Sequence, residues 1–433
     1  MLVSFSMFCS LSIALTGSVY FFLFRSTVSM EVNMQVGRGS VGIATVDDQG
    51  LIRSGPILTR LSDRPAVIST GTLDQATITF DLPDSITASD AVLGTLTLKN
   101  SSSVTLQTAR HPRFSWSQGA YTIDFNNFVG EAEIFITEIG ERPLQLRVST
   151  RQGGAVFVFD TEGRYEISAN DNTIRVITYA GRALLVSPDG RNNRFAIAGE
   201  QATLLTGSNL PVVTSAPVDL VNNGLFAFDI IPNAEGQLQI PPQWGCFNAF
   251  EQPPSGSWFS DHWQGRSSIR LLREVGDATS RTGCSRWLDV PVDNYSFLEL
   301  QATFTLNYQS LINCGFTGSE CPLMIFIDYL DTNGNRHSWY QSFFYNYDPQ
   351  NPAPLVCQEC ARPYEHRPIA EQVWYTYESG NLFSRLPDEE RPARILELRF
   401  YASGHRYDVF VSEMSLFAGT QRAIVPTDNV PQD

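Results

Sequence analysis

Cysteine is the residue type whose spacing points most directly to chemistry in this chain of 433 residues. Cys9 lies in an apolar N-terminal segment, and the others come later: Cys246, Cys284, Cys314, Cys321, Cys357 and Cys360. An even, clustered set behind an apolar segment predicts disulfides formed in an oxidising compartment. The close pairs Cys314/Cys321 and Cys357/Cys360 have two further interpretations. One is a four-thiolate zinc site, because two thiol pairs brought together suit tetrahedral zinc, and the other is free thiols.

The stretch HSWYQSFFYNYDP, residues 337–349, concentrates six aromatic rings. If it forms a strand, its side chains alternate between two faces, so that Trp339, Phe343 and Tyr345 share one face and Tyr340 lies on the other. Each buried ring removes about 150 to 250 Å² from water. We therefore expect Trp339, Phe343 and Tyr345 to form the inner wall of a β-sandwich, and any platform for sugars to lie in the loops at its ends.

Loop rings beside polar groups make up the candidate ligand site. A sugar needs a flat ring for the apolar face of its pyranose, and carboxylates, amides or arginine for its hydroxyls. The candidates are Trp258, Asp261, His262, Trp263, Gln264, Arg266, Tyr347, Trp374, Tyr375, Tyr377 and Glu378. The alternative is that these residues serve structural packing or contact with another protein.

A group of oxygen-bearing side chains lies close together in sequence: Asp328, Asp331, Asn333 and Asn335. Such ligands suit calcium, but their spacing departs from the EF-hand loop. Asn333-Gly334 favours a tight primed turn between two apolar runs, with positive φ angles at both residues. The group therefore predicts a hairpin turn first and calcium second.

Catalysis has little support. The five histidines, His111, His262, His337, His366 and His405, are scattered, and no G-x-S-x-G, H-E-x-x-H or phosphate-loop motif accompanies them. His366 and His405 have a further interpretation as metal ligands near Cys357 and Cys360. The sequence predicts a protein that is not an enzyme, with no cofactor beyond the zinc and calcium alternatives.

The charge balance bears on partners. A formal net charge of -15 and a pI near 4.8 argue against nucleic acid, since contact with phosphates needs clustered lysine and arginine.

The first segment, residues 2–24, contains no charged residue, and Arg25 closes it. It is long enough to cross a hydrocarbon core of about 30 Å as one helix. A cleaved signal peptide is the alternative, although no clear A-x-A site follows the apolar run. We expect residues 1–27 to be a single-pass anchor in the cell membrane, with the bulk of the chain extracytoplasmic.

Short alternating runs separated by turn residues fill residues 28–214, as in QATITFDL, EAEIFITEI and TIRVITY. This period of two predicts an all-β domain. Residues 53–80 (RSGPILTRLSDRPAVISTGTLDQATITF) and 173–205 (TIRVITYAGRALLVSPDGRNNRFAIAGEQATLL) resemble the opening and closing units of the FecR-like β-domain family. The resemblance implies an extracytoplasmic β-module, which in some members passes a signal to a sigma factor. Only Met1 precedes the apolar segment here, so a cytoplasmic anti-sigma region is not expected.

Residues 215–243 contain several prolines around short apolar runs, and we expect a partly ordered connector. A second all-β region is predicted for residues 244–419, followed by a loose tail, residues 420–433. Its seven or eight strand-like runs fit a jelly-roll sandwich. SWFSDHWQG, FLELQATFTLNYQSL, MIFIDYLDTNGN and LELRFYASGHRYDVFVSEMSLF resemble the jelly-roll, galactose-binding-like modules of carbohydrate-binding and cell-surface proteins.

Together these features predict a membrane-anchored binding protein of the bacterial cell surface. The predicted partner, bound through the jelly roll, is a glycan such as a polysaccharide, or another component of the cell envelope. Two alternatives are a structural or protein-interaction role without sugar binding, including contact with envelope proteins, and a FecR-type signalling component.

Overall fold

The computed structural model describes most of the chain. The described residues are 2–45, 51–54, 59–61, 65–81, 92–114, 116–137, 142–151, 154–231, 233–348, 350, 355–358, 364 and 366–420. They fold into two compact units, Met1–Ala216 and Pro217–Asp433. Apart from α1 and a few short helical turns, their regular structure is β, so the all-β prediction is confirmed.

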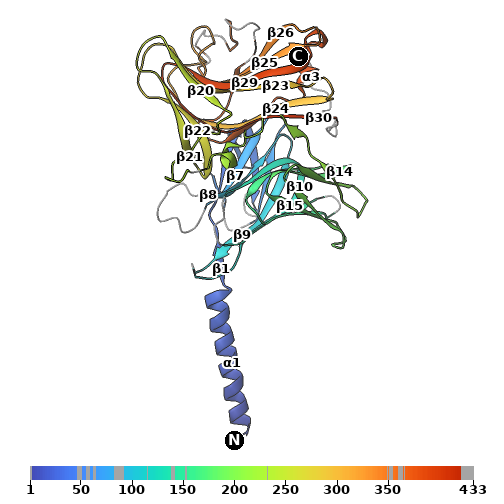
Figure 1. Ribbon diagram of the computed structural model, residues 1–433. Helices are drawn as coiled ribbons and strands as arrows, with labels where there is room; N and C mark the ends of the chain where they lie inside the picture. Colours follow the sequence, from blue (N-terminus) through green and yellow to red (C-terminus); the bar gives the residue numbers. More distant parts are fainter. Residues whose placement is uncertain are drawn as a thin grey trace. The chain divides into compact units, whose positions relative to one another are not determined.

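Helix α1 (Leu2–Phe24) begins the first unit and is drawn as one uninterrupted helix in Figure 1. Its segment Phe5–Phe24 is apolar and long enough to cross a membrane, a property that a signal sequence shares. The helix ends where the Arg25 amide donates to the Phe21 carbonyl at 2.8 Å.

The first unit contains the strands β1 (Thr27–Ser29), β2 (Val32–Arg38), β3 (Ser40–Thr45), β4 (Leu51–Ser54), β5 (Thr59–Leu61), β6 (Ala66–Thr70), β7 (Gln75–Asp81), β8 (Val92–Leu98), β9 (Ser103–Pro112), β10 (Tyr121–Ile136), β11 (Leu144–Thr150), β12 (Val156–Phe159), β13 (Gly163–Ala169), β14 (Thr173–Ala180), β15 (Arg182–Val186), β16 (Asn193–Ile197), β17 (Glu200–Leu205) and β18 (Val212–Ser215). One sheet has the order β4-β3-β6-β9-β10-β11-β12-β15-β16. The other has the order β5-β2-β7-β8-β10-β13-β14-β17-β18.

Strand β10 belongs to both of these sheets. Its first half, up to Val129, pairs with β9, and its second half, from Gly130, pairs with β13. Gly130 has a φ of +100°, and a Cβ there would lie 2.6 Å from the Cα of Ser102, so only glycine fits where the strand passes between sheets. The core of the unit is aliphatic and aromatic, with Phe80 and Phe125 in edge contact at 5.9 Å.

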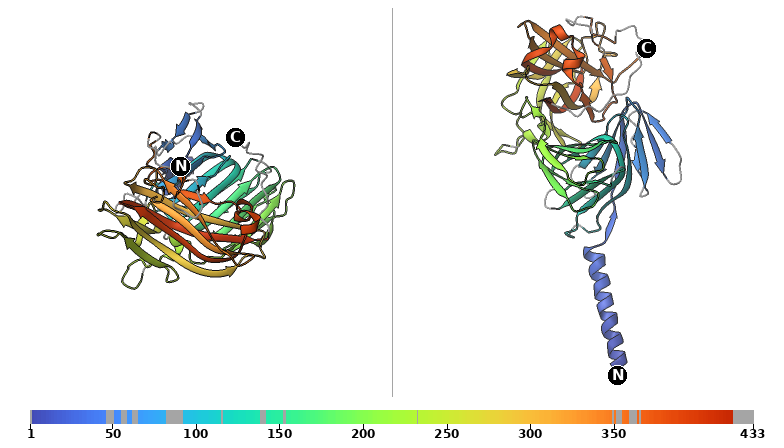
Figure 2. Two further views of the ribbon diagram at one scale, coloured as in Figure 1. Left: turned by 90° about the horizontal axis from the view of Figure 1, so that it is seen from above. Right: turned by 90° about the vertical axis from the view of Figure 1, so that its right-hand side faces the viewer.

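The second unit, drawn from green to red in Figure 2, is a two-sheet sandwich. Its elements are β19 (Val218–Asp219), α2 (Phe226–Asp229), β20 (Gly245–Phe250), β21 (Ser257–Trp263), β22 (Arg266–Arg273), β23 (Ser280–Pro291), β24 (Phe297–Gln309), β25 (Leu323–Asp331), β26 (Arg336–Phe344), β27 (His366–Pro368), β28 (Tyr375–Glu378), α3 (Leu382–Arg385), the 3-10 helix η1 (Asp388–Glu390), β29 (Pro392–Gly404) and β30 (Tyr407–Gly419). The order β21-β22-β30-β24-β28, with β19 beside β30, defines the β24 sheet, and the order β20-β23-β29-β25-β26-β27 defines the β25 sheet.

The expected connector is part of this sandwich from Pro217 onward. Strand β19 pairs with β30, and Phe226 of α2 is fully buried in the core, 5.2 Å from the ring of Trp244. The apolar runs between the prolines therefore supply core residues, which corrects the prediction of a linker.

The hairpin of β25 and β26 confirms the prediction made from its turn signal. Its turn differs in detail, because Gly334 has a positive φ of 82° whereas Asn333 does not. The Asp331 carboxylate organises the turn, accepting from the amides of Asn333 (2.7 Å) and Asn335 (2.9 Å) and from the Asn335 side chain (2.9 Å). All three bonds end on Asp331, which accounts for the turn, and calcium at Asp328, Asp331, Asn333 and Asn335 stays a prediction.

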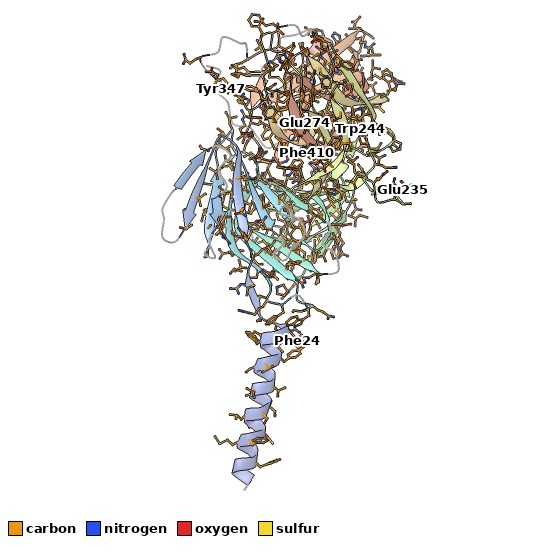
Figure 3. All side chains as sticks on the ribbon, turned by 90° about the vertical axis from the view of Figure 1, so that its left-hand side faces the viewer. Phe24, Glu235, Trp244, Glu274, Tyr347 and Phe410 are labelled. Carbon is orange, nitrogen blue, oxygen red and sulfur yellow. A yellow bond between two sulfur atoms is a disulfide. The ribbon has the colours of Figure 1, made fainter. Side chains whose placement is uncertain are left out.

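The ring-rich strand lines the core as expected. Phe343 is fully buried, 4.6 Å from the ring of Phe304, and Trp339 and Tyr345 are half-buried and pack against the same core. Trp244 and Phe410 are labelled among the side chains of this unit in Figure 3.

Candidate functional site

The structure brings only some of the predicted ligand residues together: the Arg266 guanidinium lies 5.4 Å from the ring centre of Trp374 and Arg266 pairs across strands with Trp263. Trp258, Asp261, His262 and Trp263 lie on β21, Gln264 lies in the turn that follows, and Arg266 begins β22. Trp258 is 40% exposed, whereas the ring of Trp263 packs 5.4 Å from that of Phe410. Asp261 is already paired with Arg270 at 3.0 Å, and His262 contacts the Ser267 hydroxyl at 2.9 Å.

Three of the predicted rings are buried. Trp374, Tyr375 and Tyr377 expose 2%, 4% and 0% of their surface, which corrects the expectation that they are loop rings open to a ligand. Tyr375 and Tyr377 alternate into the core from β28, and the Tyr377 hydroxyl donates to the Gln341 side chain at 3.2 Å. Tyr347, labelled in Figure 3, is half-exposed. Glu378 accepts from the Gln301 side chain at 3.2 Å.

A different surface gathers partly exposed rings beside charged groups. It is the outer face of the β25 sheet, which we call the ring face: Phe247, Arg281, Trp287, Phe326, Tyr340, Tyr364, Glu397, Arg399 and Tyr401. Alternation produces it, because Ile325, Ile327, Leu398 and Phe400 point into the core and the residues between them point outward.

The strand register aligns the ring face in rows. In one row, Tyr340, Phe326 and Arg399 pair across β26, β25 and β29. In the neighbouring row Glu397 pairs with Trp287, which is 63% exposed. Residues paired directly across strands have Cβ atoms about 5 Å apart, so the rows form one continuous surface.

Arg399 is the charged centre of this surface. Its guanidinium lies 5.1 Å from the ring centre of Phe326 and 5.7 Å from that of Phe247. The Glu397 carboxylate accepts from it through both oxygens, at 2.9 and 2.8 Å. This pair holds donors and acceptors in a fixed plane between rings, while 37% of the Arg399 side chain stays exposed.

Two tyrosines extend the ring face. The rings of Tyr340 and Tyr364 stack with centres 5.5 Å apart and planes 4° from parallel, and Phe326 meets Tyr340 edge-on at 4.9 Å. Ser342 and Tyr364 join their hydroxyls at 3.0 Å. Burial raises the pKa of Tyr340, and raises that of Tyr401 to about 12, so both are neutral hydroxyl groups at ordinary pH.

Sequence reasoning missed the ring face because its members lie in strands rather than loops. Alternation places Tyr340 on the face of its strand opposite Trp339, and Phe326 and Arg399 lie in strand-like runs that carry no signal of a ligand site of their own. The available signal was the partly polar second face of each strand, which period-two alternation defines but cannot align across strands.

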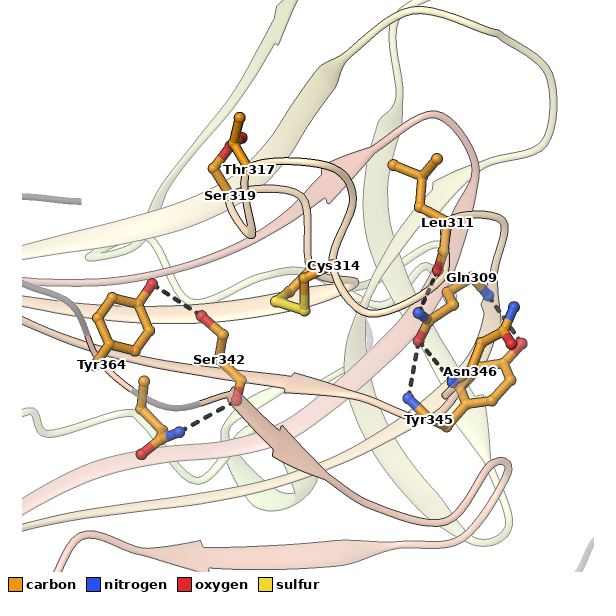
Figure 4. The surroundings of a disulfide bond; sticks show 11 residues. Gln309, Leu311, Cys314, Thr317, Ser319, Ser342, Tyr345, Asn346 and Tyr364 are labelled. Atoms are coloured by element: carbon orange, nitrogen blue, oxygen red, sulfur yellow. Dashed lines mark hydrogen bonds between the residues drawn. A yellow bond between two sulfur atoms is a disulfide. The ribbon is translucent and has the colours of Figure 1, made fainter. Parts of the chain in front are cut away.

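The cysteines form disulfides, which confirms the prediction for the described pairs. Cys246 and Cys284 join the adjacent strands β20 and β23, and Cys314 joins Cys321 across a short loop, shown in Figure 4. Cys357 is also disulfide-bonded, and Cys360 lies outside the described residues. Two sulfur atoms of the four-thiolate alternative are thus bonded to each other in this form of the protein.

The C-terminal end of α1 contacts a loop of the first unit. The Ser117 hydroxyl donates to the Phe24 carbonyl at 2.9 Å, and the ring of Phe22 meets that of Phe114 edge-on at 5.6 Å. Phe114 stacks on Trp116 at 4.7 Å, and Trp116 is 60% exposed. Aromatic side chains therefore gather where the apolar helix ends.

Comparisons with known proteins give weak similarities only. No protein-family model matches the chain, and no curated protein matches it. A solved protein described as an anti-sigma factor, from Parabacteroides distasonis, is 16% identical with a TM-score of 0.24, over 35% of this chain and 60% of its own. A family 11 carbohydrate-binding module of Clostridium thermocellum is 11% identical with a TM-score of 0.26, over 48% of this chain and 100% of the module. A xylan-binding domain of Paenibacillus barcinonensis is 13% identical with a TM-score of 0.26, over 48% of this chain and 99% of the domain. At such scores these similarities assign neither a family nor a ligand.

Proposed function

We propose that this chain is a membrane-anchored, extracytoplasmic binding protein whose ring face recognises glycan. The observation that carries the proposal is the Arg399–Glu397 pair set between the rings of Phe326 and Phe247 and beside Tyr340. Sugars combine apolar C–H faces with hydroxyls, and this surface combines flat rings with fixed hydrogen-bonding groups.

Charge supports a neutral or weakly charged sugar. Arg399 is neutralised by Glu397, and Asp328, which pairs across the strands with both Glu397 and Ser338, is bonded to Arg336 at 2.8 Å. An anionic polysaccharide needs cations that are not already paired with a carboxylate. Among the charged ring-face residues that the structure describes, only Arg281 meets this condition. Hydroxyl-rich polysaccharide is therefore the ligand class that we favour.

Three features support the proposed location of the chain, anchored in a membrane with its bulk outside the cytoplasm. They are an apolar helix long enough to span a bilayer, disulfides, and aromatic rings at the helix end. Disulfides persist in oxidising compartments, and rings such as Trp116 are common at membrane interfaces. Packing of Phe22 against Phe114 favours a helix that is retained over one that is removed as a signal.

The test is binding of soluble polysaccharides to the full chain in detergent micelles, followed by tryptophan fluorescence and calorimetry. We expect saturable binding that Phe247→Ala weakens about tenfold, the effect of losing about 1.4 kcal/mol. Phe250→Ala is the matched control, since Phe250 lies on the same strand, is 50% exposed and has the opposite orientation.

If Phe247→Ala and Phe250→Ala weaken polysaccharide binding equally, the sugar does not bind at the ring face. A folded chain that binds no polysaccharide of the panel would refute the glycan proposal and favour contact with another protein, for which partly exposed rings and arginine are equally suited.

A further inference from the structure

A second group of side chains lies beyond the ring face, around the Cys314–Cys321 disulfide (Figure 4). The sulfur atoms of Cys314 and Cys321 and a ring nitrogen of His366 all lie within 4.8 Å of one another. All three side chains are buried, against Met324 and Phe344. Once the disulfide is reduced, two cysteine thiols and an imidazole that converge in an apolar setting are the donor set of a soft-metal site.

The imidazole of His366 is buried among rings. It is 5% exposed, and no described residue forms a well-aligned hydrogen bond with either ring nitrogen, although the backbone of Gly318 lies near enough to interact with the ring. The rings of Phe344 and Tyr364 meet its imidazole edge-on, at 6.5 and 5.6 Å. Buried polar groups are nearly always bonded, and an unmade bond costs about 1 to 3 kcal/mol, so such a nitrogen points to an additional ligand.

The loop between Cys314 and Cys321 passes close to the imidazole of His366. Gly318, between the two cysteines, has a φ of +72°, and a Cβ there would lie 2.9 Å from the Nε2 of His366. Glycine at this position therefore both permits the turn and lets the loop approach the ring.

We propose that Cys314, Cys321 and His366 bind Zn²⁺ when the disulfide is reduced. Zinc binds sulfur at about 2.3 Å and imidazole at about 2.0 Å, which sets the donor atoms of one ion roughly 3.5 to 4 Å apart. A ring nitrogen of His366 lies within 4.8 Å of both sulfurs, so it would need to approach them by no more than about 1 Å, and the two sulfurs must move apart once the disulfide is reduced. Three protein donors leave the fourth tetrahedral position for water or another ligand.

The chemistry balances with a phosphine or thiol reductant. A phosphine and one water reduce the disulfide to two thiols and leave as the phosphine oxide; two thiols do the same and leave as their own disulfide. Zinc then displaces the two thiol protons, and the imidazole donates its lone pair without proton loss. In the reverse direction a small-molecule disulfide takes two electrons from the two zinc-bound thiolates and, with two protons from water, leaves as two thiols, while Cys314 and Cys321 form their disulfide and Zn²⁺ is released. The metal-bound and disulfide forms therefore exclude each other.

The experiment uses the full chain in detergent, reduced with a phosphine. Zn²⁺ is added, excess is removed, and the metal bound to each chain is measured; Co²⁺ is then substituted to record its absorption spectrum. We expect wild type to bind tightly and to show tetrahedral Co²⁺ bands with thiolate charge transfer. His366→Ala should weaken zinc affinity more than about 100-fold, beyond the usual loss from an outer-shell partner, and His366→Cys should retain it.

The controls separate this site from the other thiols and histidines. Cys246→Ser and His405→Ala remove the same groups elsewhere and should leave the Cys314/Cys321/His366 metal in place, whereas Cys314→Ser should release it. Absence of bound metal in the reduced wild type overturns the proposal. So does Co²⁺ without thiolate bands, or equal losses in Cys246→Ser and Cys314→Ser. If His366→Ala does not fold in its oxidised form, a loss of zinc in His366→Cys refutes the role of position 366.

Discussion

Trp339 and Tyr340 are sequence neighbours on β26, and we expect their replacement by alanine to have different effects. The change at Trp339 should mainly lower stability, and the change at Tyr340 should mainly lower glycan affinity. Trp339 points inward and packs against the core, whereas Tyr340 points outward onto the ring face. Replacing a fully buried tryptophan with alanine lowers the free energy of unfolding by about 3 to 5 kcal/mol. Because Trp339 is half-buried, we expect Trp339→Ala to lower the free energy of unfolding by about 3 kcal/mol.

Tyr340→Ala removes a stacked contact with Tyr364 and an edge contact with Phe326. Aromatic pairs contribute about 0.5 to 1.5 kcal/mol each, and partial exposure places these at the low end, so we expect a stability loss of about 1 kcal/mol. A ring at the centre of a binding surface is worth about 2 kcal/mol, so glycan affinity should fall roughly thirtyfold.

The assay is urea unfolding followed by fluorescence, with polysaccharide affinity measured well below each midpoint. Trp339→Ala should keep its affinity within about twofold while its midpoint drops, with an unchanged slope. If Tyr340→Ala binds as wild type does, or if both variants lose affinity in proportion to stability, the assignment of the two faces of β26 is wrong.

Three other predictions concern charge, anchoring and the disulfide of the second unit. Burial raises the pKa of Asp229 to about 6 from 3.8, so its folded form keeps a proton that the unfolded chain has lost, and stability falls as pH rises from about 4 to 6. The full shift is worth about 3 kcal/mol; partial exposure reduces it, and we expect Asp229→Asn to be about 1 kcal/mol more stable than wild type at pH 7.5 and equal to it near pH 4, by thermal unfolding. An equal gain at both pH values would contradict this. In lipid vesicles, Trp116→Phe should remove a blue-shifted emission component that lipid-borne quenchers reach, and mass spectrometry of the membrane-purified chain should find residues 2–24; a chain that begins after them is a cleaved one. Replacing Cys246 and Cys284 with serine together opens a link of 38 residues and should lower the free energy of unfolding by about 3 to 4 kcal/mol in denaturant titration, and an unchanged midpoint would show that the link is dispensable.

Local patterns predicted the elements well. An uncharged, mainly apolar run defines α1, alternation defines the strands, and Asn333-Gly334 marks the hairpin of β25 and β26. Each of these signals is carried within one stretch of chain, so no tertiary information is needed.

The candidate site required contacts that no single stretch contains. Tyr375 and Tyr377 alternate with Thr376 and Glu378 as a half-buried strand does, yet only the packing of the β24 sheet decides that their rings are core. The ring face depends on the register of β23, β29, β25 and β26, because Arg399 lies far in sequence from Phe326, over which it sits. His366 likewise meets Cys314 and Cys321 only through the fold.

Strand β10 connects the two sheets of the first unit. One half of this strand is hydrogen-bonded in each sheet, so the two sheets share one continuous backbone across Val129 and Gly130. Loosening should therefore spread from one sheet to the other through a single shared backbone, making the unit one cooperative block in native-state amide exchange. Cleavage by proteases within the described strands should then follow opening of the whole unit rather than of either sheet alone.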